Sequence, residues 1–378
     1  MNETASSHRY ALADPGEVFS PSLLFYKGLI DQNLAEAIRI VGGDPSRLRP
    51  HVKTHKTREI VEAGLGLGIT KHKCATIAEA EMLARSEVPD ILIAYPMVGP
   101  NLGRLARLVA HFPGTRFRVL ADHPSTLRGI SGAMAKAGTE VDVLVDLNVG
   151  MRRTGIVPGP GAIDLYRMIE DLPGVVPGGL QAYDGHNFQS ELGDRKAAVA
   201  ELMGPVLALR ADLESMGLPV PRLVCGGTPT FPAYASLNIP SLECSPGTFV
   251  LSDHTFATQF ADLGGFTPAA ALITRVISRT GPDLLTIDLG HKAVSGDLAL
   301  DRRLSLVGLP QAEMIQQSEE HLLVRTPEAD RFAPGDVLYA IPGHVCPTVA
   351  LHKQAFVVEG GRIVGAWDIA SRDRFLTF

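Results

Sequence analysis

The sequence has few cysteines and lacks both long apolar runs and clusters of basic residues. Its four cysteines (Cys74, Cys225, Cys244 and Cys346) lie far apart in 378 residues and form no C-x-x-C pair. This spacing excludes a disulfide framework and fits a reducing cytoplasm. No stretch reaches the roughly 18 uninterrupted apolar residues of a membrane helix, and no basic-then-apolar signal pattern opens the chain. We therefore expect a cytoplasmic protein with no membrane partner.

The charge and length of the chain further limit the kind of protein that it can be. The formal net charge is −6, from 35 basic and 41 acidic residues, with no Lys/Arg run that could follow a phosphate backbone. Nucleic acid is therefore not an expected partner. A hydrophobic content of 45% excludes wholesale disorder. The chain exceeds the roughly 250–300 residues at which a single core stops growing, so two domains are expected. Such a chain is typical of a metabolic enzyme.

Residues 20–250 alternate short apolar runs with helical patterns. In one such pattern, TIAEAEMLARSEV, Thr76 is the expected N-cap. Strands that alternate with helices imply a parallel sheet with right-handed crossovers. At about 230 residues, the economical closure is an α/β fold of the (β/α)8 TIM-barrel type, with an open doubly wound sheet as the alternative. The expected strands are residues 22–26, 49–53, 68–74, 90–95, 117–122, 142–148, 178–183 and 222–227.

The alternation of apolar runs and helical patterns ends after residue 250. Runs such as LLTIDLG, HLLVRT and QAFVVEGGRIVGAWDI indicate short strands joined by tight turns, with EGGR at residues 359–362 as a hairpin loop. We therefore expect a mainly antiparallel β domain at residues 251–378, joined by residues 1–19, beside a barrel at residues 20–250.

The octapeptide RPHVKTHK holds the densest group of ionisable side chains. In a strand, residues two apart share a face, so His51, Lys53 and His55 would point the same way. If that face lines the barrel, desolvation and cationic neighbours favour a neutral Lys53 amine, which is a nucleophile able to form a Schiff base. A solvated basic edge strand explains the same pattern.

Two glycine-flanked loops could hold an anion. In VGMRRTG, glycines on both sides let the backbone approach a ligand while an arginine holds an anionic oxygen. In CGGTPT, unshielded backbone N–H groups and a threonine suit a phosphate, and SPGT could supply a second wall. Taken alone, a helix-start loop with a surface arginine explains VGMRRTG better, and ordinary tight turns explain CGGTPT and SPGT better.

Two further motifs carry histidine. In AYDGH, Tyr183 could border a planar ring and His186 could act as an acid or base near neutral pH. In PGHVCP, His344 and Cys346 would share a strand face and offer the imidazole and thiolate that zinc prefers. Two protein ligands would leave room for water and substrate, with His352 as a third candidate. A buried cysteine beside an incidental histidine is the alternative.

Taken together, these motifs resemble the D-threonine aldolase and D-serine dehydratase family, which has the alanine-racemase-type architecture that binds pyridoxal 5′-phosphate (PLP). The resemblance covers nearly the whole chain. Its motifs occur in the family's order and approximate spacing: RPHVKTHK, TKHKCATIAEAEML, VGMRRTGI, AYDGH, CGGTPT and PGHVCPTVALH.

The resemblance implies a role for each motif. Lys53 would carry PLP, Arg153 would face its phenolic oxygen, and Tyr183 and the catalytic His186 would lie near its ring. A divalent metal, zinc or manganese, would bind to His344 and Cys346. The resemblance also implies a homodimer whose active site lies at the subunit interface. The phosphate would be bound by Gly226, Gly227, Thr228, Gly247 and Thr248.

The resulting prediction is a PLP- and metal-dependent lyase that cleaves D-3-hydroxy amino acids such as D-threonine to glycine and an aldehyde. The alternative is a D-serine or D-threo-3-hydroxyaspartate dehydratase that releases a 2-oxo acid and ammonia. Cys346 weakens the aldolase prediction without deciding it, because aldolases of the family often carry His-x-Asp at the metal pair, whereas His-x-Cys is typical of the dehydratases but also occurs in proteins classed with the aldolases. The motif HVCPTVALH as a whole resembles the aldolase group most and favours the first prediction. A racemase would need a β-domain tyrosine such as Tyr339, and a PLP homeostasis protein would lack the β domain.

Overall fold

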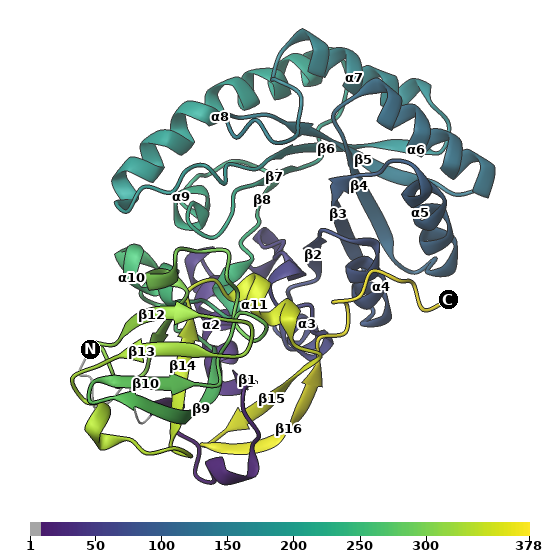
Figure 1. The fold of residues 1–378 in the computed structure, drawn as a ribbon. Coiled ribbons are helices and arrows are strands. Elements are labelled where there is room, and N and C mark those ends of the chain that lie inside the picture. Colours follow the sequence, from purple (N-terminus) through teal and green to yellow (C-terminus); the bar gives the residue numbers. More distant parts are fainter. Residues whose placement is uncertain (1–8) are drawn as a thin grey trace. The chain divides into compact units, whose positions relative to one another are not determined.

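The computed structural model describes residues 9–378, which divide into two compact units (Figure 1). The barrel unit comprises Ala37–Lys53, Val61–Gly247 and Asp373–Phe378. The β unit comprises Thr54–Ile60, Thr248–Arg372 and the described part of Met1–Glu36. The predicted joining of residues 1–19 to the β domain includes residues 1–8, which lie outside the described residues.

Seven parallel strands form the sheet of the barrel unit, and their order in space follows their order in sequence. The strands are β2 (Lys71–Cys74), β3 (Asp90–Pro96), β4 (Arg116–Ala121), β5 (Val141–Leu147), β6 (Val175–Ala182), β7 (Leu223–Cys225) and β8 (Leu242–Cys244). The helices are α3 (Arg58–Gly66, which begins in the β unit), α4 (Ile77–Arg85), α5 (Pro100–His111), α6 (Pro124–Ala137), α7 (Pro160–Asp171), α8 (Leu192–Ser215) and α9 (Phe231–Ala235).

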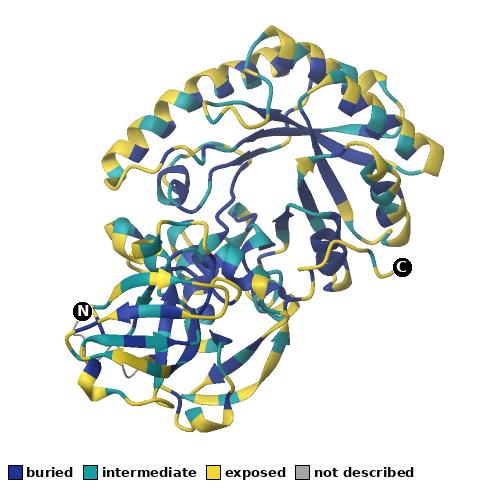
Figure 2. Ribbon diagram, in the orientation of Figure 1, coloured by how far each residue is buried: buried dark blue, intermediate teal, exposed yellow. Residues whose placement is uncertain are grey.

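Apolar residues fill the inside of this curved sheet. Leu92, Leu120, Leu144 and Val224 come from four different strands and form one buried cluster. The strands are buried while the outward faces of the helices are exposed (Figure 2). Helix α4 begins as predicted, because the Thr76 hydroxyl accepts a hydrogen bond of 3.1 Å from the Glu79 N–H. Burial of both sheet faces is what the continuous apolar runs predict.

The segment from Leu48 to His51 joins the two edges of the sheet. Leu48 forms a parallel bridge to Cys244 in β8, and His51 forms one to Lys73 in β2. Backbone N–H groups of Arg49 and Lys73 donate to Cys244 and Pro50, each at 2.8 Å. The segment therefore occupies the place of an eighth strand. The predicted (β/α)8-type fold is confirmed, and the sequential strand order excludes a doubly wound sheet.

Three details of the strand prediction are wrong. Residues 22–26 form β1 (Ser22–Tyr26), which pairs in the β unit and not in the barrel. The strand after β7 is instead β8, whose three residues were too short to give a periodic signal. Residues 49–53 are also no regular strand, because Val52–Thr54 form a 3-10 turn.

A layer of ion pairs lies where the barrel strands begin. The guanidinium of Arg49, which is fully buried, contacts Asp90 at 2.7 Å and Glu243 at 2.5 Å. Asp90 also binds Arg118 at 2.6 Å, and Lys71 binds Glu243 at 2.9 Å. Each buried cation thus meets carboxylates from neighbouring strands, which compensates for the loss of its hydration.

The β unit contains a mixed sheet centred on β9 (Ala270–Gly281), which pairs with β1, β10 and β14. Within the described residues, β1 and β15 pair in parallel and the other pairs of this sheet are antiparallel, as predicted for the second domain. The remaining strands are β10 (Leu284–Ile287), β11 (Leu304–Leu306), β12 (Glu313–Gln317), β13 (Leu322–Arg325), β14 (Val337–Pro342), β15 (Gln354–Glu359) and β16 (Arg362–Asp368). The helices are α2 (Lys27–Ile40, which ends in the barrel unit), α10 (His254–Gln259) and α11 (Val345–Leu351).

The predicted hairpin is confirmed. Glu359 in β15 pairs with Arg362 in β16, and Gly360 and Gly361 between them have φ angles of 57° and 75°. Two consecutive residues with positive φ are characteristic of a two-residue hairpin turn, and glycine adopts them without a Cβ clash. Among residues 9–378, no helix has both the length and the apolar character needed to cross a membrane.

Replacing Asp90 with Asn should lower the free energy of unfolding by about 3 kcal/mol at pH 7, because buried Arg49 and Arg118 would each lose an ionic partner. Burial alone would raise the pKa of Asp90, but Arg118 and Arg49 hold it well below its usual range. The ionised carboxylate therefore stabilises the fold above about pH 4, and this contribution is lost as the pH falls further.

Urea unfolding, monitored by circular dichroism, measures the difference in free energy of unfolding between the wild type and Asp90→Asn. This difference should become smaller as the pH falls from about 5 towards 3. Glu214→Gln is the matched control, since its partially exposed pair with Arg210 lies within one helix and contributes about 0.3–0.5 kcal/mol. Equal effects of the two substitutions would contradict the stabilising role of the buried layer.

Candidate functional site

The predicted site residues fall in both units. Lys53, Arg153, Tyr183, His186, Gly226, Gly227, Thr228 and Gly247 belong to the barrel unit, whereas Thr248, His344 and Cys346 belong to the β unit.

Three cations surround the ring of Tyr183, which follows β6. The Lys53 Nζ lies 6.0 Å from the ring centroid, the Lys73 Nζ 5.8 Å and the Arg153 Cζ 4.9 Å. Within residues 9–378, none of the three side chains forms an ion pair with a carboxylate. Attraction to the face of an aromatic ring offsets only part of the repulsion among three cations. The arrangement therefore suits an anionic ligand.

Lys53 is not positioned as the sequence pattern predicted. It lies in the 3-10 turn Val52–Thr54, and its backbone N–H donates to Nδ1 of His51 at 3.2 Å. The alternation of strand faces therefore does not apply to His51, Lys53 and His55. His55 is buried and hydrogen-bonded to the backbone of Thr57, and burial lowers its pKa to about 3. His55 is thus a neutral structural residue.

Lys73 was not among the predicted site residues. It lies on β2, is 3% exposed and has its pKa lowered to about 7, first by burial and then by the positive charge of Lys53. The sequence did contain a signal: Lys71, His72 and Lys73 place charged and polar groups in a strand that is otherwise expected to be apolar.

The loop that carries Arg153 is held by short local hydrogen bonds. The Asn148 side chain accepts from the N–H groups of Gly150 and Arg152, both at 3.1 Å, and the Thr154 hydroxyl donates to Asp146 at 2.8 Å. Gly150 has a φ of +127°, and a Cβ there would lie 2.7 Å from Nε2 of His186. Glycine is therefore required for the approach of the His186 imidazole.

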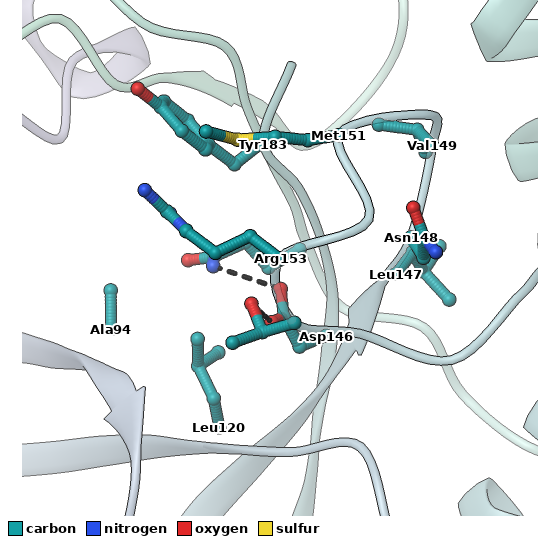
Figure 3. A pocket seen from close by; sticks show the side chains of 11 residues that line it. Ala94, Leu120, Asp146, Leu147, Asn148, Val149, Met151, Arg153 and Tyr183 are labelled. Atoms are coloured by element: carbon teal, nitrogen blue, oxygen red, sulfur yellow. Dashed lines mark hydrogen bonds between the residues drawn. The ribbon is translucent and has the colours of Figure 1, made fainter. Parts of the chain in front are cut away.

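A cavity of about 340 Å³, including the part open to solvent, lies beside this loop. Figure 3 shows the side chains of Arg153 and Tyr183 extending in the same direction at its edge. Asp146 lines the cavity and accepts a hydrogen bond of 3.1 Å from the Gln181 side chain. Burial raises the pKa of Asp146. The cavity is lined by Ala94, Leu120, Asp146, Leu147, Asn148, Val149, Met151, Arg153, Thr154, Gln181 and Tyr183.

The CGGT turn follows β7, and the residues after it are held by hydrogen bonds to Asp184. This buried carboxylate accepts from Thr230 at 2.9 Å and from Tyr234 and Asn187, both at 3.2 Å, and burial raises its pKa. A Cβ at Gly226 would lie 2.6 Å from the ring of Tyr234, so glycine lets that ring pack against the turn.

Two amides that were predicted to bind phosphate donate to threonine hydroxyls within the barrel unit. The N–H of Gly247 donates to Thr228 at 3.0 Å, and the N–H of Gly227 donates to Thr230 at 3.3 Å. The two turns predicted to form the phosphate cradle therefore contact each other through Gly247 and Thr228.

The histidine and cysteine of the β unit lie at the start of α11 and not on a strand. His344 is its N-cap residue and Cys346 lies in its first turn, so the predicted shared strand face is wrong. Nδ1 of His344 lies 2.6 Å from Asp297, which also accepts from the Ser295 hydroxyl at 2.7 Å. A carboxylate on one ring nitrogen fixes the orientation of a metal-binding histidine and leaves the other nitrogen for the ion.

Cys346 contacts two hydroxyl groups of the same unit. Its Sγ lies 3.2 Å from Oγ1 of Thr54 and 3.7 Å from Oγ1 of Thr248. Burial alone would lower the pKa of His344, but Cys346 and Asp297 raise it to about 9. A thiolate and a carboxylate that favour a cation at this ring would likewise favour a metal ion. Among residues 9–378, however, no group of three or more His, Cys, Asp or Glu side chains forms a metal-binding cluster.

Buried Asp253 holds the start of this helix. Its carboxylate accepts hydrogen bonds of 3.2 Å from the N–H of Val345 and 2.9 Å from the N–H of Phe256. Burial raises the pKa of Asp253 to about 6. Two other candidates have structural partners. His352 Nε2 lies 2.7 Å from the carbonyl of Ala293, and the Tyr339 hydroxyl accepts from the N–H of Leu12 at 3.0 Å.

The four cysteines are free, as expected for a chain without a disulfide framework. Cys74, Cys225 and Cys244 are buried, whereas Cys346 is partly exposed. Burial raises the pKa of Cys244 to about 12 and also raises the pKa of Cys225, so these thiols remain protonated. Cys346 is thus the accessible thiol among the four.

Comparisons with known proteins agree with this architecture. The chain is 29% identical to D-threonine aldolase from Arthrobacter sp over 371 residues, covering 95% of each chain. It is 25% identical to D-threo-3-hydroxyaspartate dehydratase from Delftia sp., covering 92% of this chain and 96% of that protein. The crystal structure of D-threonine aldolase from Filomicrobium marinum superposes with a TM-score of 0.88 at 27% identity, covering 94% and 96% of the two chains.

Family models match both parts of the chain. Residues 269–358 match the putative serine dehydratase domain, and residues 28–252 match the alanine racemase N-terminal domain. Because the second match covers more than half of the sequence, the chain belongs to the alanine racemase N-terminal domain family.

Proposed function

We propose that this protein is a PLP- and divalent-metal-dependent lyase that cleaves D-3-hydroxy amino acids of the D-threonine type to glycine and an aldehyde. The observation that carries the proposal is the group of Lys53, Lys73 and Arg153 around Tyr183, none of which is paired with a carboxylate from residues 9–378. Two relatives that are aligned over nearly the whole chain are named D-threonine aldolase and 3-hydroxy-D-aspartate aldolase.

The donor set fits PLP, which carries an aldehyde, a phenolic oxygen and a phosphate. When bound, this cofactor withdraws electrons from Cα of an attached amino acid. Lys53 would supply the amine that binds the aldehyde carbon, and Arg153 would neutralise the phenolic oxygen. Tyr183 would border the ring. The phosphate would be held by Gly226, Gly227, Thr228, Gly247 and Thr248, once Gly227 and Gly247 turn their N–H groups from the threonine hydroxyls to the ligand.

The residues around α11 fit a divalent ion, zinc or manganese. His344 would offer the ring nitrogen that is not bound to Asp297, and Cys346 would offer a thiolate. Water and substrate oxygens would complete the ligand shell, since the chain supplies two ligands. In this arrangement His186 would remove the proton of the substrate's β-hydroxyl, and an ion held by His344 and Cys346 would supply positive charge beside that oxygen.

A dehydratase is the second candidate. The segment that matches the putative serine dehydratase domain contains His344 and Cys346, and the pair reads His-x-Cys, which favours this reaction. In a dehydratase Lys53 would remove the proton from Cα, and the β-hydroxyl would leave. The products would then be a 2-oxo acid and ammonia.

We further propose a homodimer in the cytoplasm, in which the β unit of one subunit completes the barrel site of the other. The four free cysteines are compatible with that compartment. The small-molecule substrate is the expected partner.

Incubation with D-threonine, PLP and Mn²⁺ or Zn²⁺ should yield glycine and acetaldehyde, as measured by chromatography and an aldehyde assay. Lys53→Ala should lose the visible absorption band of bound PLP and at least roughly 10³-fold in activity, because the attachment amine is gone. Formation of 2-oxobutyrate and ammonia would overturn the aldolase in favour of the dehydratase. Survival of the band in Lys53→Ala would reject the cofactor assignment.

Metal binding should depend on Cys346 and Asp297 to different degrees. Cys346→Ser should abolish metal-dependent activity while the PLP band remains, because a ligand is lost from the ion and not from the cofactor. Asp297→Asn should weaken metal affinity by about 10–100-fold, since it only orients His344. Titration of the chelator-treated variants with zinc measures the metal affinity of Cys346→Ser and of Asp297→Asn. Asp262→Asn, which removes another carboxylate of the same unit, is the control and should keep the wild-type affinity. Wild-type chelator sensitivity in Cys346→Ser would reject this site.

A further inference from the structure

Strand β2 carries two lysines with opposite surroundings. Lys71 and Lys73 are two residues apart and so point to the same side of the strand. Lys71 forms an ion pair of 2.9 Å with Glu243 in the buried ionic layer. Lys73, one step further along the strand, has neither a hydrogen bond from its amine nor an ion pair within residues 9–378.

An unpaired lysine at 3% exposure is costly for the fold. Transfer of an ammonium group out of water requires hydrogen bonds or a counter-ion, and in their absence the group tends to lose its proton. The Lys73 amine lies over the face of Tyr183, 5.8 Å from the ring centroid, and the Lys53 amine lies at nearly the same distance of 6.0 Å. The amine therefore faces the same ring as the proposed attachment lysine.

The charges around Lys73 favour neither protonation state strongly. Burial is the largest influence and disfavours the ammonium form, as do Lys53 and Arg49, whereas Asp146 favours it. The resulting pKa is about 7. Asp146 already accepts from Thr154 and Gln181, so it remains a distant counter-charge with no direct bond to Lys73. A group of this kind can both donate and accept a proton at neutral pH.

We propose that Lys73 is a second catalytic lysine, which delivers a proton to Cα of the substrate after the Cα–Cβ bond has broken. The inference rests on the proposed function. In the cleavage, the β-hydroxyl loses a proton, the C–O bond becomes the aldehyde carbonyl, and the electron pair of the broken bond remains on Cα. The Lys73 ammonium gives its proton to Cα, which yields glycine, and the neutral amine regains a proton equivalent to the one that left the hydroxyl. The substrate and the two products thus contain the same atoms.

The test measures exchange of the glycine α-hydrogen in D₂O by proton NMR, using PLP-loaded protein. This exchange needs proton transfer at Cα but no carbon–carbon cleavage. Lys73→Met should slow the exchange by about 10²-fold or more, and Lys73→Arg should do the same, because arginine keeps the charge but does not release a proton near neutral pH. Lys71→Met is the matched control from the same strand and should leave the exchange unchanged.

Two readouts do not depend on turnover. Borohydride reduction followed by peptide mapping should find PLP on Lys53 in the wild type and in both Lys73 variants. The absorption of bound PLP should change with a midpoint near pH 7 in the wild type, and this change should be absent from Lys73→Met. A merely structural role for Lys73 would leave that titration in place.

The outcomes separate the proposals. Exchange in Lys73→Met within threefold of the wild type would overturn the role of Lys73 and assign proton transfer to Lys53. Restored exchange in Lys73→Arg would overturn it as well, since charge alone would then suffice. PLP found on Lys73 in the wild type would do the same. If the wild-type protein exchanges the glycine α-hydrogen but does not cleave D-threonine, the aldolase proposal is rejected and the role of Lys73 in proton transfer stands. If the wild-type protein does neither, both proposals are rejected.

Discussion

The contact between Arg49 and the two carboxylates of Asp90 and Glu243 is the interaction on which the barrel unit depends. Among residues 9–378, the segment from Leu48 to His51 meets the neighbouring strands through two isolated bridges and no longer ladder. The buried guanidinium ties this segment to β3 and β8 from within. Since Lys53 lies at the end of the same stretch, the ion pair also fixes the starting point of the turn that presents the proposed attachment lysine.

The barrel interior therefore has two kinds of electrostatic environment. Where the strands begin, Arg49, Arg118 and Lys71 each meet a carboxylate, and the charges cancel locally. Around Tyr183, Lys53, Lys73 and Arg153 have no carboxylate partner within the described residues. An anion that binds there removes a repulsion that the folded protein otherwise retains, so its binding energy also adds to the stability of the fold. This division agrees with the usual separation of stability and function between the two ends of such barrels.

The sequence predicted the architecture well where periodicity is strong. The alternation of strands and helices, the N-cap Thr76 and the glycine hairpin were all found where they were expected. The strand of residues 22–26 was misassigned because an apolar run reveals its burial but not its partners, which lie in the other unit. Lys53 and His344 were expected on strands, but alternation of side chains has no meaning in a 3-10 turn or at a helix N-cap. Lys73 was missed because burial without an ionic partner depends on tertiary contacts, which sequence spacing does not contain.

The pairing of β1 with β15 has a consequence for the order of folding. Leu24 lies near one end of the chain and pairs with Phe356 near the other, and β1 is held on its second edge by β9. During synthesis, strands β2 to β8 leave the ribosome long before β15 exists, and domains generally fold as units as they emerge. The sheet of the β unit, by contrast, must hold one edge of β1 unpaired until β15 has been made. Its assembly is therefore a late step governed by contacts of long sequence separation, which form slowly. The start of α11, which carries His344 and Cys346, lies in this late-forming unit, so the proposed metal site would form after the barrel has folded.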